Sequence, residues 1–214
     1  MPHEHDAHCG HEATAHDHDH GHDTSDLGPQ DNLFTQIDRD NVVALNADDA
    51  LGSVVIKPWN ERLDETKSIA SDADDQIIIR IPFTSSVRLR ALLLKAGPGD
   101  QTPAKVALYA NEDDLDFNDI EDKAATQEFE VAQGREVGEY ALRPAKFSNL
   151  SSVSLLFPAS QGADTTQIYY VGFLGHWTER KNSGAPITVY ELQPNLADHE
   201  KIQGTDGATN SPQF

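Results

Sequence analysis

The middle of the chain repeats one pattern, in which short segments of alternating apolar and polar residues are separated by turn residues. Residues 76–83 carry Ile77, Ile79 and Ile81 on one face, and Pro82 is expected to end this strand. A period of two is typical of a β-strand with one buried face. The same texture predicts further strands at residues 86–95, 105–110, 127–131, 139–142, 152–157, 167–174 and 187–192.

The predicted strand at residues 86–95 places its apolar side chains on one face, at Val87, Leu89, Ala91 and Leu93. Between the strands, only residues 31–37 and 113–122 are candidates for brief helical turns. Parallel strands need crossover connections of about a dozen residues or more, usually helical. The sequence therefore predicts an all-β fold with two packed antiparallel sheets, that is, a β-sandwich or jelly roll.

Composition changes at both ends of the chain. Residues 1–30 contain eight of the ten histidines and almost no large apolar side chain, so we expect a disordered His-rich tail. Residues 31–200 have the texture of one folded domain, and residues 201–214 return to a flexible, polar composition. No repeat at a fixed period of 20 to 50 residues is visible, which argues against solenoids and propellers.

Charge and cysteine content narrow the class of protein. The net charge of −20 argues against nucleic-acid binding, because the field of the protein repels phosphates. No segment approaches the roughly 18 apolar residues of a membrane span, and the N-terminus lacks the pattern of a signal peptide. Cys9 is the only cysteine, so no disulfide forms within the chain. We expect a soluble protein of the cytoplasm, with the nucleus as a second compartment.

The His-rich tail contains candidate ligands for transition metals. Imidazole and thiolate groups bind Zn²⁺, Ni²⁺ and Cu²⁺. The candidate ligands are Cys9, His16, His18, His20 and His22. A disordered His tract binds such ions whether or not the cell uses it, so we expect adventitious binding and no dedicated cofactor. Metal handling through the tail remains an alternative function.

Enzyme chemistry is not expected. His176 and His199 are the only histidines of the predicted domain, and no G-x-S-x-G motif accompanies them. The chain also lacks a P-loop, a dinucleotide fingerprint and a Cys-x-x-Cys motif.

A series of short motifs, in one fixed order, resembles the PITH family, whose name comes from proteasome-interacting thioredoxin-like proteins. The resemblance covers about residues 31–200 and is closest to members that stand alone, without a redox domain. Its motifs are Ile37-Asp38-Arg39, Leu45-Asn46, Lys57-Pro58-Trp59, Glu61-Arg62, Ser71-Asp72-Ala73-Asp74, Ile81-Pro82-Phe83, Phe147-Ser148-Asn149, Gly162-Ala163-Asp164-Thr165-Thr166, Gly172-Phe173-Leu174-Gly175, Trp177-Thr178-Glu179 and Ala197-Asp198-His199.

The resemblance implies a jelly-roll β-sandwich similar to galactose-binding-like domains. It also implies a non-enzymatic docking module, whose partner in thioredoxin-like relatives is the 26S proteasome, with the regulatory particle as the expected contact. The fold likeness leaves a second alternative open, a carbohydrate-binding module in which an aromatic side chain and polar loop residues hold a sugar.

Candidate partner-binding residues come from three of these motifs. They are Lys57, Trp59, Asp164, Thr165, Thr166 and Trp177. Trp59 follows a rigid proline, so it is either a partner anchor or a tryptophan that covers the core. The loop that holds Asp164 either only keeps its own shape or joins the Trp59 region in a ligand patch at one end of the sandwich.

Overall fold

The computed structural model describes residues 28–180, so residues 1–27 of the predicted N-terminal tail, the whole predicted C-terminal tail and the predicted strand at residues 187–192 lie outside the described residues. Within this range, all strand pairs are antiparallel. The strands are β1 (Val43–Leu45), β2 (Ile69–Ala70), β3 (Ile77–Ala96), β4 (Lys105–Ala110), β5 (Gln127–Glu130), β6 (Gly138–Ala141), β7 (Leu150–Phe157) and β8 (Gln167–Thr178).

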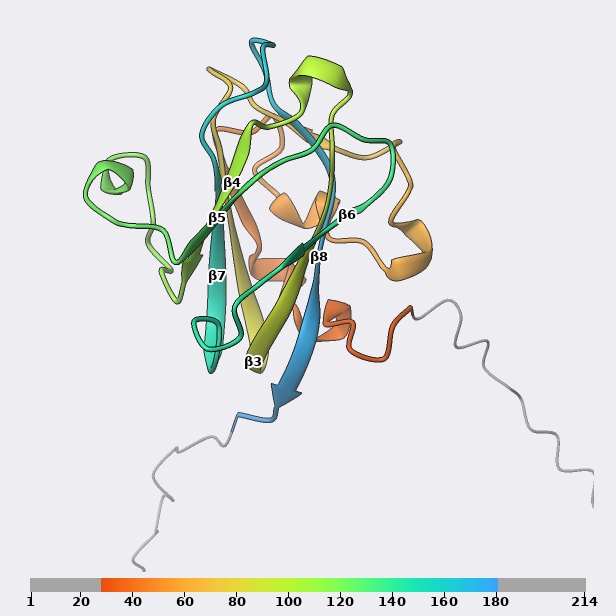
Figure 1. Cartoon of the computed structure of the whole chain (residues 1–214), viewed down its shortest axis with the longest axis vertical. Helices are drawn as coiled ribbons and strands as arrows, with labels where there is room; N and C mark the ends of the chain where they lie inside the picture. Colours follow the sequence, from red (N-terminus) through yellow and green to blue (C-terminus); the bar gives the residue numbers. More distant parts are fainter. Residues whose placement is uncertain (1–27, 181–214) are drawn as a thin grey trace, which may run out of the picture. The chain divides into compact units, whose positions relative to one another are not determined.

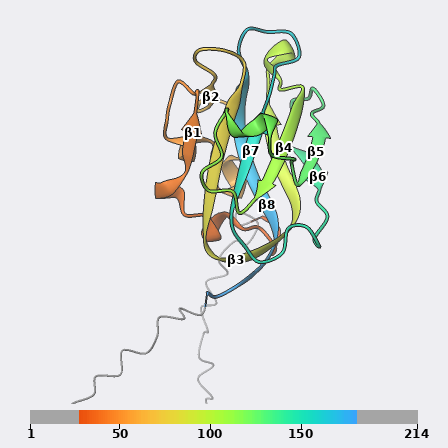
Figure 2. The same cartoon turned by 90° about the vertical axis from the view of Figure 1, so that its left-hand side faces the viewer.

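The long strand β3 belongs to both layers of a sandwich. Its first half pairs with β1 and β7, and its second half pairs with β8 and β6. One layer therefore has the order β5-β4-β7-β3-β1, and the other has the order β2-β8-β3-β6. Figure 1 shows β4, β5 and β7 together, with β6 and β8 on the other side of the long β3, and Figure 2 shows the same strands after a 90° turn. The prediction of an all-β jelly-roll sandwich is confirmed.

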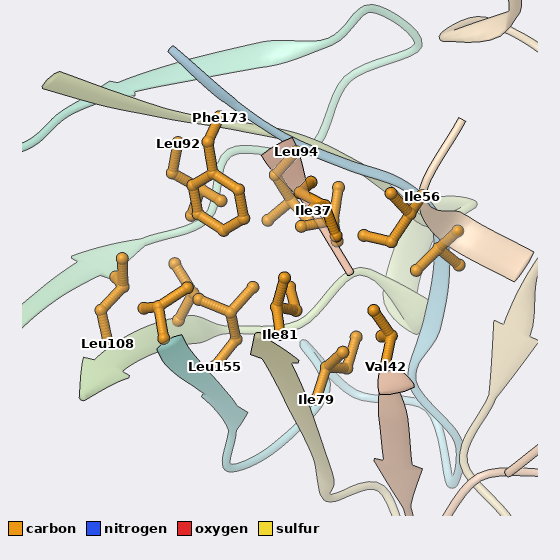
Figure 3. Packing of buried hydrophobic residues seen from close by; sticks show 14 of the residues in the cluster. Ile37, Val42, Ile56, Ile79, Ile81, Leu92, Leu94, Leu108, Leu155 and Phe173 are labelled. Carbon is orange, nitrogen blue, oxygen red and sulfur yellow. The ribbon is translucent and has the colours of Figure 1, made fainter. Parts of the chain in front are cut away.

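The core lies between the two layers. Figure 3 shows Leu92, Leu94 and Phe173 facing a second row of side chains across the sandwich. The second row contains Ile79, Ile81, Leu108 and Leu155. The alternating isoleucines of the sequence are in this core, as predicted, and the solvent reaches none of Ile77, Ile79 and Ile81.

The prediction that Pro82 ends its strand is wrong. β3 continues through Pro82 to Ala96, and its pairing with β7 shifts register between Pro82 and Val87. Proline lacks an N–H and is tolerated in a sheet where the ladder is irregular. The Pro82 carbonyl still accepts a hydrogen bond, from the Asp38 amide at 2.9 Å.

The predicted face of the segment at residues 86–95 is correct only in its first half. Val87 and Leu89 lie in the main core, but Ala91 and Leu93 lie in a separate cluster, and Leu92 and Leu94 replace them. The register between β3 and β8 shifts between Leu89 and Ala91, which is the mark of a β-bulge. One extra residue in a strand moves every later side chain to the opposite face.

The helical segments are single turns. The predicted turns at residues 31–37 and 113–122 contain η2 (Phe34–Gln36) and η7 (Asp119–Glu121). The other short helices are η3 (Arg39–Asn41), η4 (Gly52–Val55), η5 (Trp59–Glu61) and η6 (Gly99–Gln101). No helix between residues 28 and 180 has the length and apolar character that would let it cross a membrane.

Candidate interaction surface

Lys57 is buried and holds its own loop together. Only 5% of its surface is exposed, and its Nζ donates hydrogen bonds of 2.7 Å to the carbonyl oxygens of Asp64 and Lys67. Burial lowers the pKa of the Lys57 ammonium, while the Asp64 carboxylate at 3.5 Å acts in the opposite direction. Lys57 thus makes its hydrogen bonds within the loop at residues 57–67.

Trp59 covers the outer face of the β3–β8 layer. Its indole packs against the cluster that contains Leu93 and Tyr170. The Arg62 guanidinium lies 4.3 Å from the ring centroid, and Arg62 also donates a 2.9 Å hydrogen bond to the Trp59 carbonyl. On another side, a Cβ atom at Gly28 would lie 2.3 Å from the indole, so the backbone at Gly28 touches the ring. These contacts agree with the interpretation of Trp59 as a packing residue.

The loop before β8 is tied to its neighbours by hydrogen bonds. Thr166 is fully buried, and its hydroxyl donates to the Asp75 carbonyl at 2.6 Å. Thr165 accepts a 2.9 Å bond from the Gln101 amide group. Asp164 is exposed. Thr165 and Thr166 therefore hold the loop in shape, and Asp164 is the member of this group that faces solvent.

The candidate residues do not form one patch. Thr166 directly precedes β8, whereas Trp177 is the second-last residue of this strand. At a rise of about 3.3 Å per residue, β8 separates them by about 35 Å. Figure 1 shows β8 running along the length of the domain, with its start and its end at opposite ends. The predicted patch combined the Asp164 loop with the Trp59 region, and Trp59 packs against the cluster that contains Tyr170 and Leu174 of β8.

Trp177 is the more exposed of the two tryptophans, with 52% of its surface open to solvent. It lies opposite Val87 on β3, and the neighbouring His176 lies opposite Arg88. Arg88 and His176 point to the outer face of the layer, because Val87 points into the core and side chains alternate along a strand. Trp177 lies opposite Val87, so its indole is on the other face of the layer from Arg88 and His176.

The charges around Trp177 are partly compensated. Arg90 donates to the carboxylates of Asp31 and Glu139, the latter at 2.9 Å. The bond from Arg90 holds the pKa of the Asp31 carboxyl below its ordinary value, against the effect of burial. In contrast, Arg88 has no ion pair with any acid between residues 28 and 180. Arg88 lies on the face opposite to the indole, so we define the Trp177 surface by the residues that line one hollow with Trp177, which are Gln30, Asp31, Gly175 and His176.

Sequence reasoning singled out Trp177 but did not place Arg88 beside His176 on the opposite face of the layer. The alternating pattern indicated only that Arg88 faces away from the core, as most strand arginines do. Its place beside His176 depends on the pairing of β3 with β8, which brings together residues about 90 positions apart. No sequence signal specifies that pairing.

The candidate metal ligands of the tail lie outside the described residues. These ligands are Cys9, His16, His18, His20 and His22. In the part of the chain that is described, no group of three His, Cys, Asp or Glu side chains is arranged to hold a metal ion.

The comparison with solved structures concerns the fold. The carbohydrate-binding domains CBM32-1 and CBM32-2 of Clostridium perfringens ZmpB match with a TM-score of 0.50 and 12% identity, over 73% of this chain and 40% of theirs. The fold is thus of the galactose-binding-like kind. At this identity the likeness says nothing about a ligand.

Sequence comparison identifies the family. The model of the PITH domain matches residues 23–194. The PITH domain-containing protein GA19395 of Drosophila pseudoobscura pseudoobscura is 36% identical over 205 residues, which cover 94% of each chain. The human PITH domain-containing protein 1 is 35% identical over 177 residues, covering 81% of this chain and 82% of its own. These names describe a domain and no reaction, and the chain belongs to the PITH-domain family.

Proposed function

We propose that this protein is a non-enzymatic adaptor that binds a large protein complex through the Trp177 surface. The expected complex is the 26S proteasome, with its regulatory particle as the contact. The adaptor acts by binding alone, without a dedicated cofactor, in the cytoplasm and with the nucleus as a second compartment.

The exposure of Trp177 is the observation that supports this proposal. Because 52% of its surface is in water, Trp177 does not gain the full free energy of transferring a large apolar side chain out of water. Burial by a partner would supply the rest of this free energy. Tryptophan and arginine are the residue types most enriched where a few side chains dominate the binding energy. Gln30, Asp31, Gly175 and His176 line the same hollow as Trp177, so a partner that covers the indole can also contact these residues.

The rigid setting of this surface also favours binding. His176 and Trp177 are on β8, and their pairing with Arg88 and Val87 of β3 holds the backbone in one conformation. A partner therefore pays little ordering entropy for these residues, in contrast to residues on a mobile loop.

Affinity purification from cells under mild salt tests the proposal. The full chain should retain subunits of the proteasome regulatory particle, and Trp177→Ala should reduce their recovery by about tenfold or more. Leu51→Ala is the matched control, because Leu51 is a comparably exposed apolar residue on another part of the domain, 62% open to solvent. This control should retain the partner.

Equal recovery with Trp177→Ala and the unchanged chain would contradict the proposed surface. Recovery of a different protein complex, lost with Trp177→Ala, would retain the adaptor function and remove the proteasome as its partner. Circular dichroism of the purified variants confirms that each remains folded.

A further inference from the structure

A short stretch before η2 already acts as an additional strand beside β8. The Gly175 amide donates to the Asp31 carbonyl at 2.8 Å, and the Leu33 amide donates to the Phe173 carbonyl at 3.0 Å. Between them, Asn32 and Leu174 form an antiparallel bridge. This edge of β8 is therefore covered by residues 31–33 as far as Gly175.

The covering stretch leaves β8 before it reaches Trp177. The Asn32 amide donates to the Pro29 carbonyl at 2.9 Å, which closes a turn. Beyond this turn, Gly28 adopts a φ of 75° and its backbone contacts Trp59. A left-handed φ of this kind suits glycine and redirects the chain. Among residues 28–180, no segment pairs with the last residues of β8 on this side.

The hydrogen-bond pattern shows which way the Trp177 peptide group points. Leu89 and Gly175 are opposite each other, but the Leu89 amide donates to the Phe147 carbonyl at 3.0 Å and the Gly175 amide donates to Asp31. They are thus a pair without mutual hydrogen bonds. In an antiparallel ladder such pairs recur at every second residue, so Val87 and Trp177 form the next one.

The N–H and C=O of Trp177 therefore point away from β3, towards the uncovered edge. Neither group has a hydrogen-bond partner between residues 28 and 180. A hollow of about 520 Å³ lies at this place and is lined by Gln30, Asp31, Gly175, His176 and Trp177. The edge thus has an unpaired donor, an unpaired acceptor and space beside them.

We propose that this edge of β8 receives an extended segment of the partner protein, which adds a strand by pairing with Trp177. The inference rests on the proposed function and specifies how the Trp177 surface recognises its partner. The partner residue opposite Trp177 carries an apolar side chain, because that side chain lies on the same face as the exposed indole.

An extended peptide fits this edge better than other ligands. An N–H and a C=O on one strand residue match the backbone of a second strand, and residues 31–33 bind the same edge in this way within the chain. Exposed strand edges are usually blocked by proline or lysine. The last residues of β8 are His176, Trp177 and Thr178, none of which blocks pairing.

Amide hydrogen exchange of the free full chain is the first test. The Trp177 amide should exchange quickly, and the Gly175 amide should be protected by its bond to Asp31. A protected Trp177 amide in the free protein would overturn the proposal, because the chain itself or a second copy would then occupy the edge.

The second test selects short peptides from a random displayed library on the immobilised full chain. Peptides that also bind the Trp177→Pro variant are discarded, because this variant lacks the N–H that should pair with the peptide. A selected peptide should protect the Trp177 amide. Methylation of the backbone nitrogen of the peptide residue that faces Trp177 should weaken binding by about tenfold or more. Methylation of either neighbouring peptide residue should have little effect. Sensitivity to N-methylation at every second peptide residue is what antiparallel strand pairing predicts.

The absence of any such peptide would overturn strand addition, as would equal sensitivity to N-methylation at all positions. These outcomes are separate from failure of the proposed function. Suppose that Trp177→Ala loses the cellular partner while, in the complex of the unchanged chain with that partner, the Trp177 amide still exchanges quickly. In that case the adaptor function stands and strand addition does not.

Discussion

Tyr170 allows a quantitative test of the packing on the outer face of the β3–β8 layer. Only 1% of its surface is exposed, and it lies in the cluster that also contains Leu93 and Leu174. Burial raises the pKa of the Tyr170 phenol from 10.0 to about 12, although the positive charge of Arg62 acts in the opposite direction. The fold therefore favours the neutral phenol over the phenolate.

The expected effect on stability follows from these two values. Each pKa unit corresponds to about 1.4 kcal/mol, so the preference for the neutral phenol is worth up to about 2.7 kcal/mol. Because the pKa in the folded state lies above the pKa in the unfolded state, this contribution is complete below about pH 10. It is lost as the pH rises towards about 12, and at about pH 11 roughly 1.4 kcal/mol is already gone.

Urea unfolding of the full chain at about pH 8 and about pH 11 measures this loss, with Tyr170→Phe as the comparison. The difference between the two proteins cancels the titration of the other tyrosines and lysines. The free energy of unfolding should fall by about 1.4 kcal/mol less in Tyr170→Phe than in the unchanged chain. An equal fall in both proteins would refute the reasoning, because Tyr170 would then ionise in the folded state as readily as in water.

Three further predictions concern single contacts. Lys57→Met should lower the free energy of unfolding by about 1–3 kcal/mol, because two carbonyl oxygens lose their donor, and an unchanged urea midpoint would contradict this. Arg90→Gln should raise the pKa of Asp31 towards 3.8 in an NMR titration. Since the folded-state pKa of Asp31 is lowered, the Asp31–Arg90 pair stabilises the fold above about pH 4 and loses this effect as acid protonates the carboxylate. Gly175→Ala should destabilise the fold strongly in thermal melts, because its Cβ would lie 2.2 Å from a backbone oxygen of β3, whereas Gly134→Ala, with open space around it, should melt like the unchanged chain.

The two tryptophans illustrate the limit of sequence reasoning for the site. Each stands next to a proline or a strand end, and nothing in the local sequence separates a packing role from a binding role. The structure shows that Arg62 and Gly28 contact Trp59 whereas Trp177 remains half exposed, which is why we propose the binding role only for Trp177. The places of Arg62 and Gly28 beside Trp59 depend in turn on the fold around them, so the local sequence does not specify these contacts.

The sequence by itself determined the fold class and most of the strands. Alternation with a period of two marks which residues can face a core, and this information is local, so β4 was predicted with the bounds that the structure has. The motif order also identified the family.

Only the tertiary structure decided where the alternation breaks and which residues meet. The bulge after Leu89 and the passage of β3 through Pro82 depend on pairing with β7 and β8, which are far away in sequence. Residues 31–33 cover β8 only as far as Gly175, because the chain turns at Pro29 and Gly28 contacts Trp59. Such features depend on contacts between distant segments, and a pattern within one segment carries no information about them.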